Sequence, residues 1–343
     1  MSARRWVLTA ISFLFAIGAS VYIIRASWSH EGARVSLPWW GHLACLTVAT
    51  TEILTRAAKI RLSAAAVRIP LTLRTAIHVS LGGDFGGAIT PARSGAEPAR
   101  FLVLREAGTP AADALVVLFL ELFLEMLSLT ALVSALALVL GGSTAQMRGL
   151  LGMLTAYSAF VIGGGAIGYA VSRRTSDEPP RWAHWLRLDG ERWAAMQRPL
   201  RQLRANVAKL RRARWWVMAG ALALSIIHIL LRLAVLPIII YSLGVRAPLG
   251  PIILWPLAIL YGSSAAPAPA GGGLIEVAFR GALGGHIPAH IMGAALLWWR
   301  VYTFYILLVC GAIVTGGVVM RALKRNEEAE AEPAQSLGSV AAE

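Results

Sequence analysis

The sequence has few charged residues. Asp, Glu, Lys and Arg make up 15% of its 343 positions, whereas hydrophobic residues make up 57%, and the mean hydropathy is +0.64. An average soluble domain carries about 25% charged residues. This composition excludes an ordinary soluble globular protein and predicts a polytopic membrane protein.

Cysteine is nearly absent. The two cysteines, Cys45 and Cys310, lie far apart within apolar segments and form no Cys-x-x-Cys pair. We therefore expect neither a disulfide framework nor a zinc site, and interpret both thiols as small buried hydrophobic groups.

Common catalytic signatures are missing as well. The chain has no GxxxxGK[ST] phosphate loop, no HExxH motif and no CxxC motif. The run Arg93-Ser94-Gly95 continues with Ala96, where a Pro-Ser-Gly-His phosphatase motif would have histidine. We therefore predict no catalytic residue, no metal and no cofactor, and an enzyme is kept only as the alternative function.

Long apolar runs dominate what is present. A membrane-spanning helix needs about 20 mostly apolar residues, and we predict an all-α polytopic bundle of about six to eight such helices within a membrane domain at 1–325. The acidic segment 326–343 is predicted to be a disordered tail. The plain spans are roughly 6–24, 38–55, 113–140, 150–171, 215–243 and 293–320.

The net charge of +14 comes from basic residues between the apolar runs. Of the 32 Lys and Arg residues, 25 lie before residue 6, in 56–105, in 173–214 or in 321–325. The positive-inside rule therefore places these segments and both termini in the cytoplasm, and this distribution argues against nucleic acid as a partner. Segment 173–214 also has an amphipathic helical pattern, which predicts either a helix on the anionic membrane surface or a loop that only fixes topology.

Two apolar segments are interrupted by glycine and proline. Residues 70–89 are rich in glycine, and Pro256, Pro267, Pro269 and the triplet 271–273 are expected to stop any continuous helix after residue 251. We predict two broken or re-entrant elements that enter from opposite sides, which is compatible with an inverted repeat. The alternatives are ordinary loops and, for 251–292, two short crossings.

Ionisable residues inside apolar segments are costly and are therefore candidates for function. Glu121 and Glu125 lie four residues apart on one helix face, while Arg232 and Arg300 lie in two other apolar runs. Two interpretations stay open: either glutamate pairs with one of these arginines to hold the bundle, or the charges line a path for a lipid headgroup or a proton.

Two helix starts carry further candidates. Ser94 and Glu97 have the spacing of a capping box, and Arg93 and Arg100 flank this predicted N-terminus, where a phosphate could bind. Glu276 follows the glycine triplet and is expected in the first turn of a second helix, whose positive end would face a cavity.

Four motifs occur in order: "TPARSGAEPARFLVLREAG" at 90–108, "ELFLE" at 121–125, "PAPAGGGLIE" at 267–276 and "LLWWR" at 296–300. Together they resemble the lysylphosphatidylglycerol synthase transmembrane (flippase-like) family over about residues 6–320. In the motif that corresponds to 121–125, members often have Glu-Arg at the start and Asp at the end, whereas this chain has Glu121-Leu122 and Glu125. The resemblance carries family motif positions to Thr90, Pro91, Gly95, Glu97, Arg100, Pro269, Gly271, Gly272, Glu276 and Arg300.

The resemblance implies a multi-helix inner-membrane protein of bacteria or archaea. The best-known members fuse this region to a soluble aminoacyltransferase domain and move the aminoacylated phospholipid across the bilayer. This chain resembles the stand-alone members, for which transport of a phospholipid, a polyprenyl-linked lipid or a hopanoid-associated lipid is implied. Membrane lipids are the expected partners, with a homo-oligomer possible. The alternative is a lipid-modifying enzyme, or a membrane subunit or scaffold for a separately encoded transferase.

We therefore expect a headgroup cavity between the two interrupted elements. Arg93, Arg100 and the helix N-termini would neutralise a phosphate, while Glu121, Glu125 and Glu276 would bind a cationic group or compensate the arginines. The candidate site residues are Asp84, Thr90, Arg93, Glu97, Arg100, Glu121, Glu125, Arg232, Gly271, Gly272, Gly273, Glu276 and Arg300.

Overall fold

The computed structural model describes residues 14, 17–26, 36–140, 145–172, 215–262, 269–271 and 273–318. Within these ranges the secondary structure is entirely helical, which confirms the all-α prediction. The predicted amphipathic segment 173–214, the predicted tail 326–343 and Gly272 lie outside the described residues.

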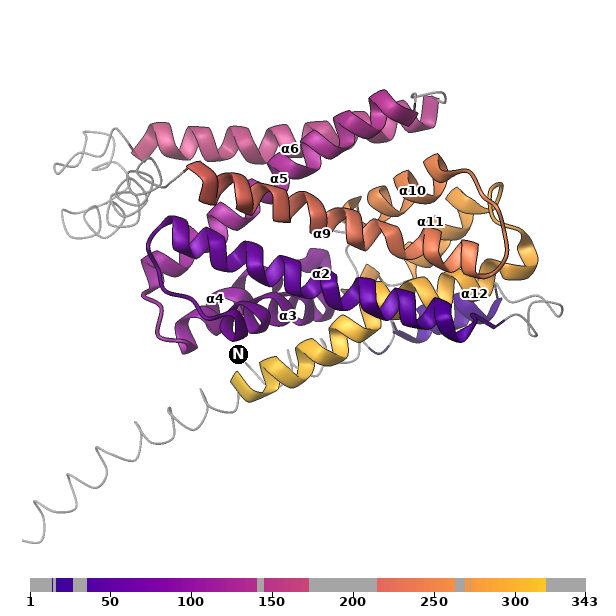
Figure 1. The fold of residues 1–343 in the computed structure, drawn as a ribbon, viewed down its shortest axis with the longest axis horizontal. Helices are drawn as coiled ribbons and strands as arrows, with labels where there is room; N and C mark the ends of the chain where they lie inside the picture. The colour runs from indigo at the N-terminus through magenta and orange to yellow at the C-terminus, as the bar shows by residue number, and fades with distance from the viewer. Residues whose placement is uncertain are drawn as a thin grey trace, which may run out of the picture.

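Helices occupy the positions of the predicted spans, and short turns join several of them (Figure 1). The π-helical turn η5 (Val301–Tyr305) carries the last helix on to residue 318. The two other short elements are the 3₁₀ turns η2 (Pro91–Arg93) and η4 (Pro269–Gly271). The helices are Ile17–Ala26, α2 (Trp39–Ala66), α3 (Leu73–Ile89), α4 (Ala96–Glu106), α5 (Ala111–Leu140), α6 (Ala145–Ser172), α9 (Trp215–Ser242), α10 (Leu249–Gly262), α11 (Leu274–Leu283) and α12 (Ala289–Arg300).

Three helical segments of the described chain are long and apolar enough to cross a membrane: Asp113–Leu136, Trp215–Ser242 and Ala289–Val318. Helix α2 extends 11 residues beyond the predicted span end at residue 55. The apolar run in the sequence ends before the helix does, because the C-terminal half of α2 carries the buried charged residues Arg56 and Lys59.

The main core forms where α2 and α9 lie against each other and α10, α11 and α12 pack beside them (Figure 1). Apolar side chains of all five helices contribute to it, among them Ile239, Phe279 and Trp299. Cys45 is buried in this core, as predicted, whereas Cys310 is only partly buried. This packing fixes the helices from which the site is built.

The first interrupted segment is not broken at its glycines. Helix α3 runs through all of them and ends at Ile89, and the chain then turns at η2 and returns as α4. The glycines allow the two helices to approach: a Cβ at Gly86 would lie 2.5 Å from the carbonyl oxygen of Gly95, and a Cβ at Gly95 would lie 2.6 Å from that of Gly86. The prediction that this element is broken within its glycine-rich stretch was wrong, because here the glycines serve close helix packing.

The predicted capping box is also not formed. Helix α4 begins after Gly95, and the hydroxyl of Ser94 donates to the carbonyl oxygen of Pro91 at 2.9 Å. The side chain of Thr90 stabilises this turn instead, because its Oγ1 accepts a hydrogen bond from the backbone N–H of Gly95 at 2.8 Å. Spacing alone could not show which hydroxyl would face the turn.

In the second interrupted segment, the helix continues past the first predicted break at Pro256. Helix α10 continues through Pro256 to Gly262, since one proline removes only one backbone hydrogen bond from a helix that is held by its neighbours. Turn η4 follows at Pro269–Gly271, and α11 begins at Leu274 after its N-cap Gly273, whose φ of 83° is in the left-handed region. Turn η4 contacts both η2 and α3, so the two interrupted segments meet. The inverted repeat stays a prediction.

Candidate functional site

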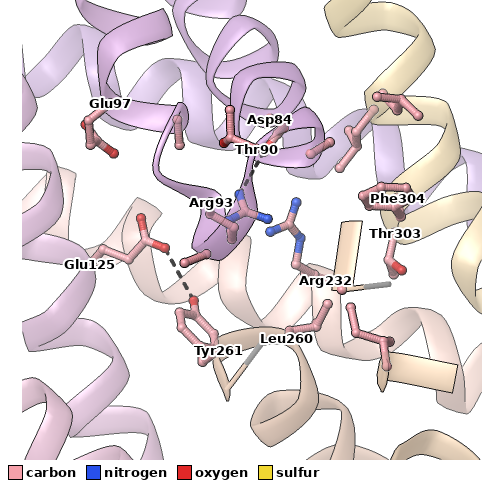
Figure 2. A pocket seen from close by; sticks show the side chains of 18 of the residues that line it. Asp84, Thr90, Arg93, Glu97, Glu125, Arg232, Leu260, Tyr261, Thr303 and Phe304 are labelled. Carbon is pink, nitrogen blue, oxygen red and sulfur yellow. Dashed lines mark hydrogen bonds and ion pairs between the residues drawn. The ribbon is translucent and has the colours of Figure 1, made fainter. Parts of the chain in front are cut away.

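A cavity of about 300 Å³ lies where the two interrupted segments meet (Figure 2). One part of its wall is charged and another is apolar. Both interrupted segments, together with α4, α5, α9 and α12, contribute to the wall. The charged lining residues are Asp84, Arg93, Glu97, Arg100, Glu125, Arg232 and Arg300, and the apolar ones include Leu122, Met126, Leu260, Ile275, Phe304, Leu307 and Leu308.

Asp84 is fixed by an arginine from α2. Arg56 donates from both terminal nitrogens, at 2.9 Å from Nη1 to Asp84 Oδ1 and from Nη2 to Asp84 Oδ2. This two-pronged pair is buried and ties α3 to α2. Asp84 therefore reaches the cavity with both carboxylate oxygens already accepting a hydrogen bond.

Glu121 and Glu125 pair with a lysine that the sequence analysis did not select. The ammonium of Lys59 is fully buried and lies 2.8 Å from Glu121 Oε1 and 3.1 Å from Glu125 Oε2. Glu121 also accepts a hydrogen bond from Arg100, which in turn lies 3.1 Å from Glu97 Oε1. The pairing with Arg232 or Arg300 that was one sequence interpretation is therefore not present.

Arg300 is held by Glu276, as part of a cluster beside the cavity. Arg300 Nε lies 2.8 Å from Glu276 Oε1, which also accepts the hydroxyl of Ser20. The guanidinium stacks on the ring of Phe304 with its central carbon 4.2 Å from the ring centroid. Glu276 occupies the first turn of α11, as predicted, but is completely buried and does not line the cavity.

Arg93 and Arg232 are placed differently from the other cations. Figure 2 shows their guanidinium groups pointing toward one another in the middle of the cavity. Arg93 Nη2 lies 3.7 Å from Asp84 Oδ1, and Arg232 Nε lies 3.6 Å from Glu52 Oε1. Both distances exceed normal hydrogen-bond length.

A strained turn carries Arg93 to this position. Ala92 and Arg93 have φ values of 51° and 54°, in the left-handed region that residues other than glycine rarely adopt. Such strain persists only where the surrounding structure imposes it, and it is found often at functional sites.

Glu125 lies on another side of the cavity. The Tyr261 hydroxyl donates to Glu125 Oε1 at 3.5 Å, and 20% of the Glu125 side chain is exposed (Figure 2). The cavity therefore presents two guanidiniums at its centre and a carboxylate on a neighbouring wall.

Nine of the thirteen predicted site residues line the cavity, and Glu121, Gly273 and Glu276 do not. Gly272 lies outside the described residues. The sequence analysis missed Arg56, Lys59 and Tyr261. The spacing of Glu52, Arg56 and Lys59 by four and three residues, which puts them on one helix face, could have indicated the first two.

The model of the family "Lysylphosphatidylglycerol synthase TM region" matches residues 6–311. The chain belongs to this family. As a lysylphosphatidylglycerol synthase TM region protein it is a multi-pass membrane protein, and the match includes every residue that lines the cavity. No aminoacyltransferase domain is detected in the chain. A search of curated proteins finds no match to it.

Proposed function

We propose that the protein moves a lipid across the bacterial inner membrane by admitting the polar headgroup to the cavity while the acyl chains stay in the bilayer. The substrate is a phospholipid or another lipid-linked headgroup. Both termini are cytoplasmic in this proposal, because the Lys and Arg residues cluster in alternate segments.

The observation that carries the proposal is a charged cavity inside an apolar helical bundle. Irregular backbone at membrane depth is tolerated where it is buried in protein or lines a wet cavity, and η2 and η4 both border this one. The charged wall suits a headgroup, and the apolar wall at Leu307 and Leu308 suits the first carbons of the lipid tails. A separately encoded lipid-modifying enzyme would be an additional partner.

Lipid movement in vesicles tests the proposal. Purified protein would be reconstituted with fluorescent phosphatidylglycerol, and dithionite would quench the label in the outer leaflet, with and without an imposed proton gradient. We expect the protein to increase the quenched fraction, and Leu122→Trp, which fills the cavity, to slow this movement several-fold.

Leu115→Trp is the matched control, because Leu115 lies on the same helix but 55% of its surface is exposed on the outside. Equal movement by the parent and the Leu122 variant would show that lipid does not pass through the cavity. Loss of movement in both variants would assign the effect to α5 as a whole.

A further inference from the structure

Six cations and six acids surround the cavity, and they are not equivalent. Four cations are held close to an acid: Arg56 by Asp84, Lys59 by Glu121 and Glu125, Arg100 by Glu121 and Glu97, and Arg300 by Glu276. Of these six cations, the two whose nearest carboxylate oxygen lies beyond 3.5 Å are Arg93 and Arg232.

Each distant acid is also shared. Asp84 already accepts two hydrogen bonds from Arg56, and Glu52 lies 3.7 Å from Arg56 as well as 3.6 Å from Arg232. Arg93 and Arg232 donate no hydrogen bond to any acceptor in the described part of the chain. Their donors therefore face the cavity with their hydrogen-bonding capacity unused.

Two guanidiniums that face each other in a partly buried space repel one another, since the low local dielectric screens them weakly. Their side chains are 36% and 20% exposed, respectively. An anion between them would remove this repulsion and satisfy donors on both sides. The left-handed φ of Arg93 sets the backbone position from which one of the two groups extends into the cavity.

We propose that Arg93 and Arg232 form a phosphate-binding subsite, with Arg100 and Arg300 contributing only to the surrounding potential. The fork of an arginine matches two oxygens of a phosphate, and two forks can approach one tetrahedral group from two directions, whereas a carboxylate presents its two oxygens in a single plane. The subsite deepens the proposed function, since a phospholipid headgroup carries this group, but binding at the subsite does not depend on transport.

Binding to the full-length protein in detergent tests the subsite. The probes are inorganic phosphate, short-chain phosphatidic acid, short-chain phosphatidylglycerol and uncharged short-chain diacylglycerol, with affinity measured by calorimetry and by the ligand-induced rise in Tm. We expect Arg93→Gln and Arg232→Gln each to weaken binding of the phosphate-bearing probe about 10-fold or more. The double variant should lose less than the product of the two single losses, because both side chains bind one group.

Arg280→Gln is the control, because Arg280 is an exposed arginine on α11 outside the cavity. Unchanged phosphate affinity in both cavity variants, equal weakening in the control, or arginine-independent binding of diacylglycerol at the affinity of phosphatidic acid would overturn the proposal. Arginine-dependent binding of both inorganic phosphate and phosphatidic acid supports a site for the phosphate group itself. Binding of the phosphorylated lipids alone, again dependent on the arginines, supports a site for the lipid phosphate.

The stability of the ligand-free variants separates a binding role from a structural one. If Arg93 and Arg232 repel one another, the Tm of each Gln variant without phosphate should equal or exceed that of the parent. A lower Tm in both variants would show that the arginines support the fold and would overturn the proposal. Phosphate binding without lipid movement would support the subsite and refute the proposed transport. Lipid movement that is unchanged in both arginine variants would support transport and refute the subsite.

Discussion

Replacing Lys59 with methionine is expected to destabilise the protein strongly, although methionine fills a similar volume and is apolar. The ammonium group is fully buried between Glu121 and Glu125, at 2.8 Å and 3.1 Å from their oxygens. The substitution leaves two carboxylates four residues apart on one face of α5 without the cation that lies between them.

The size of the stability loss depends on which polar contacts Glu121 and Glu125 keep when the ammonium group is removed. Removing one partner of a buried ion pair typically costs about 3–5 kcal/mol, because the other charge stays buried and unpaired. Glu121 keeps Arg100, so the penalty falls mainly on Glu125, whose other polar contact is the Tyr261 hydroxyl at 3.5 Å. Since Glu125 is partly exposed to the cavity, we expect the free energy of unfolding to fall by about 3 kcal/mol, at the lower end of that range.

Reversible unfolding in mixed detergent micelles, followed by tryptophan fluorescence, measures this loss. Arg61→Met is the control, because Arg61 is an exposed cation on the same helix. The double variant Lys59→Met/Glu125→Gln should recover about 1–2 kcal/mol, since it removes the unpaired carboxylate. A loss below about 1 kcal/mol for Lys59→Met, or additive losses in the double variant, would refute the argument from an uncompensated buried charge.

The same unfolding assay checks three smaller changes. Gly86→Ala should destabilise the hairpin of α3 and α4 by about 1–3 kcal/mol, whereas Gly281→Ala, where an added Cβ meets nothing within 4 Å, should stabilise the protein by up to about 1 kcal/mol; equal effects would contradict the packing argument. Ala92→Gly relieves a φ of 51° and should raise stability by up to about 1 kcal/mol, so a lower stability would show that this turn is not strained. Ser20→Ala removes a hydrogen bond to the buried Glu276 carboxylate and should cost about 1.5–3 kcal/mol, and no change would mean that Arg300 alone satisfies that oxygen.

Local apolar content was enough to predict the helical class and the approximate places of the long helices. It did not predict the behaviour of glycine in α3, because a glycine-rich stretch is a turn when it is exposed and a contact surface when another helix lies against it. The close approach of Gly86 and Gly95 depends on where α4 returns, and this is a property of the folded chain. Pro256 is a similar case, since neighbouring helices hold α10 together across it.

Seven of the nine charged candidates line the cavity, but the ion pairs considered for Glu121 and Glu125 are not the ones formed. Counting basic residues placed Arg56, Lys59 and Arg100 with the cytoplasmic loop charges, yet all three are buried in ion pairs. One interpretation paired Glu121 with Arg232 or Arg300, whereas its partners in the structure are Lys59 and Arg100. A sequence shows which helix face carries a charge, but the partner depends on how the helices are arranged around it.

The ion pairs around the cavity are a poor explanation of stability. Replacing a buried ion pair with well-packed apolar residues is often neutral or stabilising, because the desolvation of two charges offsets their attraction. A bundle that only had to fold would therefore gain little from the pairs at Asp84, Glu121 and Glu276. The positions of these pairs explain their presence better than stability does. Each pair fixes an arginine or an acid at the edge of one cavity, and the pairs come from helices on different sides of it. In the proposed subsite, these pairs neutralise most of the wall, and Arg93 and Arg232 are left to attract an anion because their nearest carboxylate oxygens lie at 3.7 Å and 3.6 Å, beyond normal hydrogen-bond length.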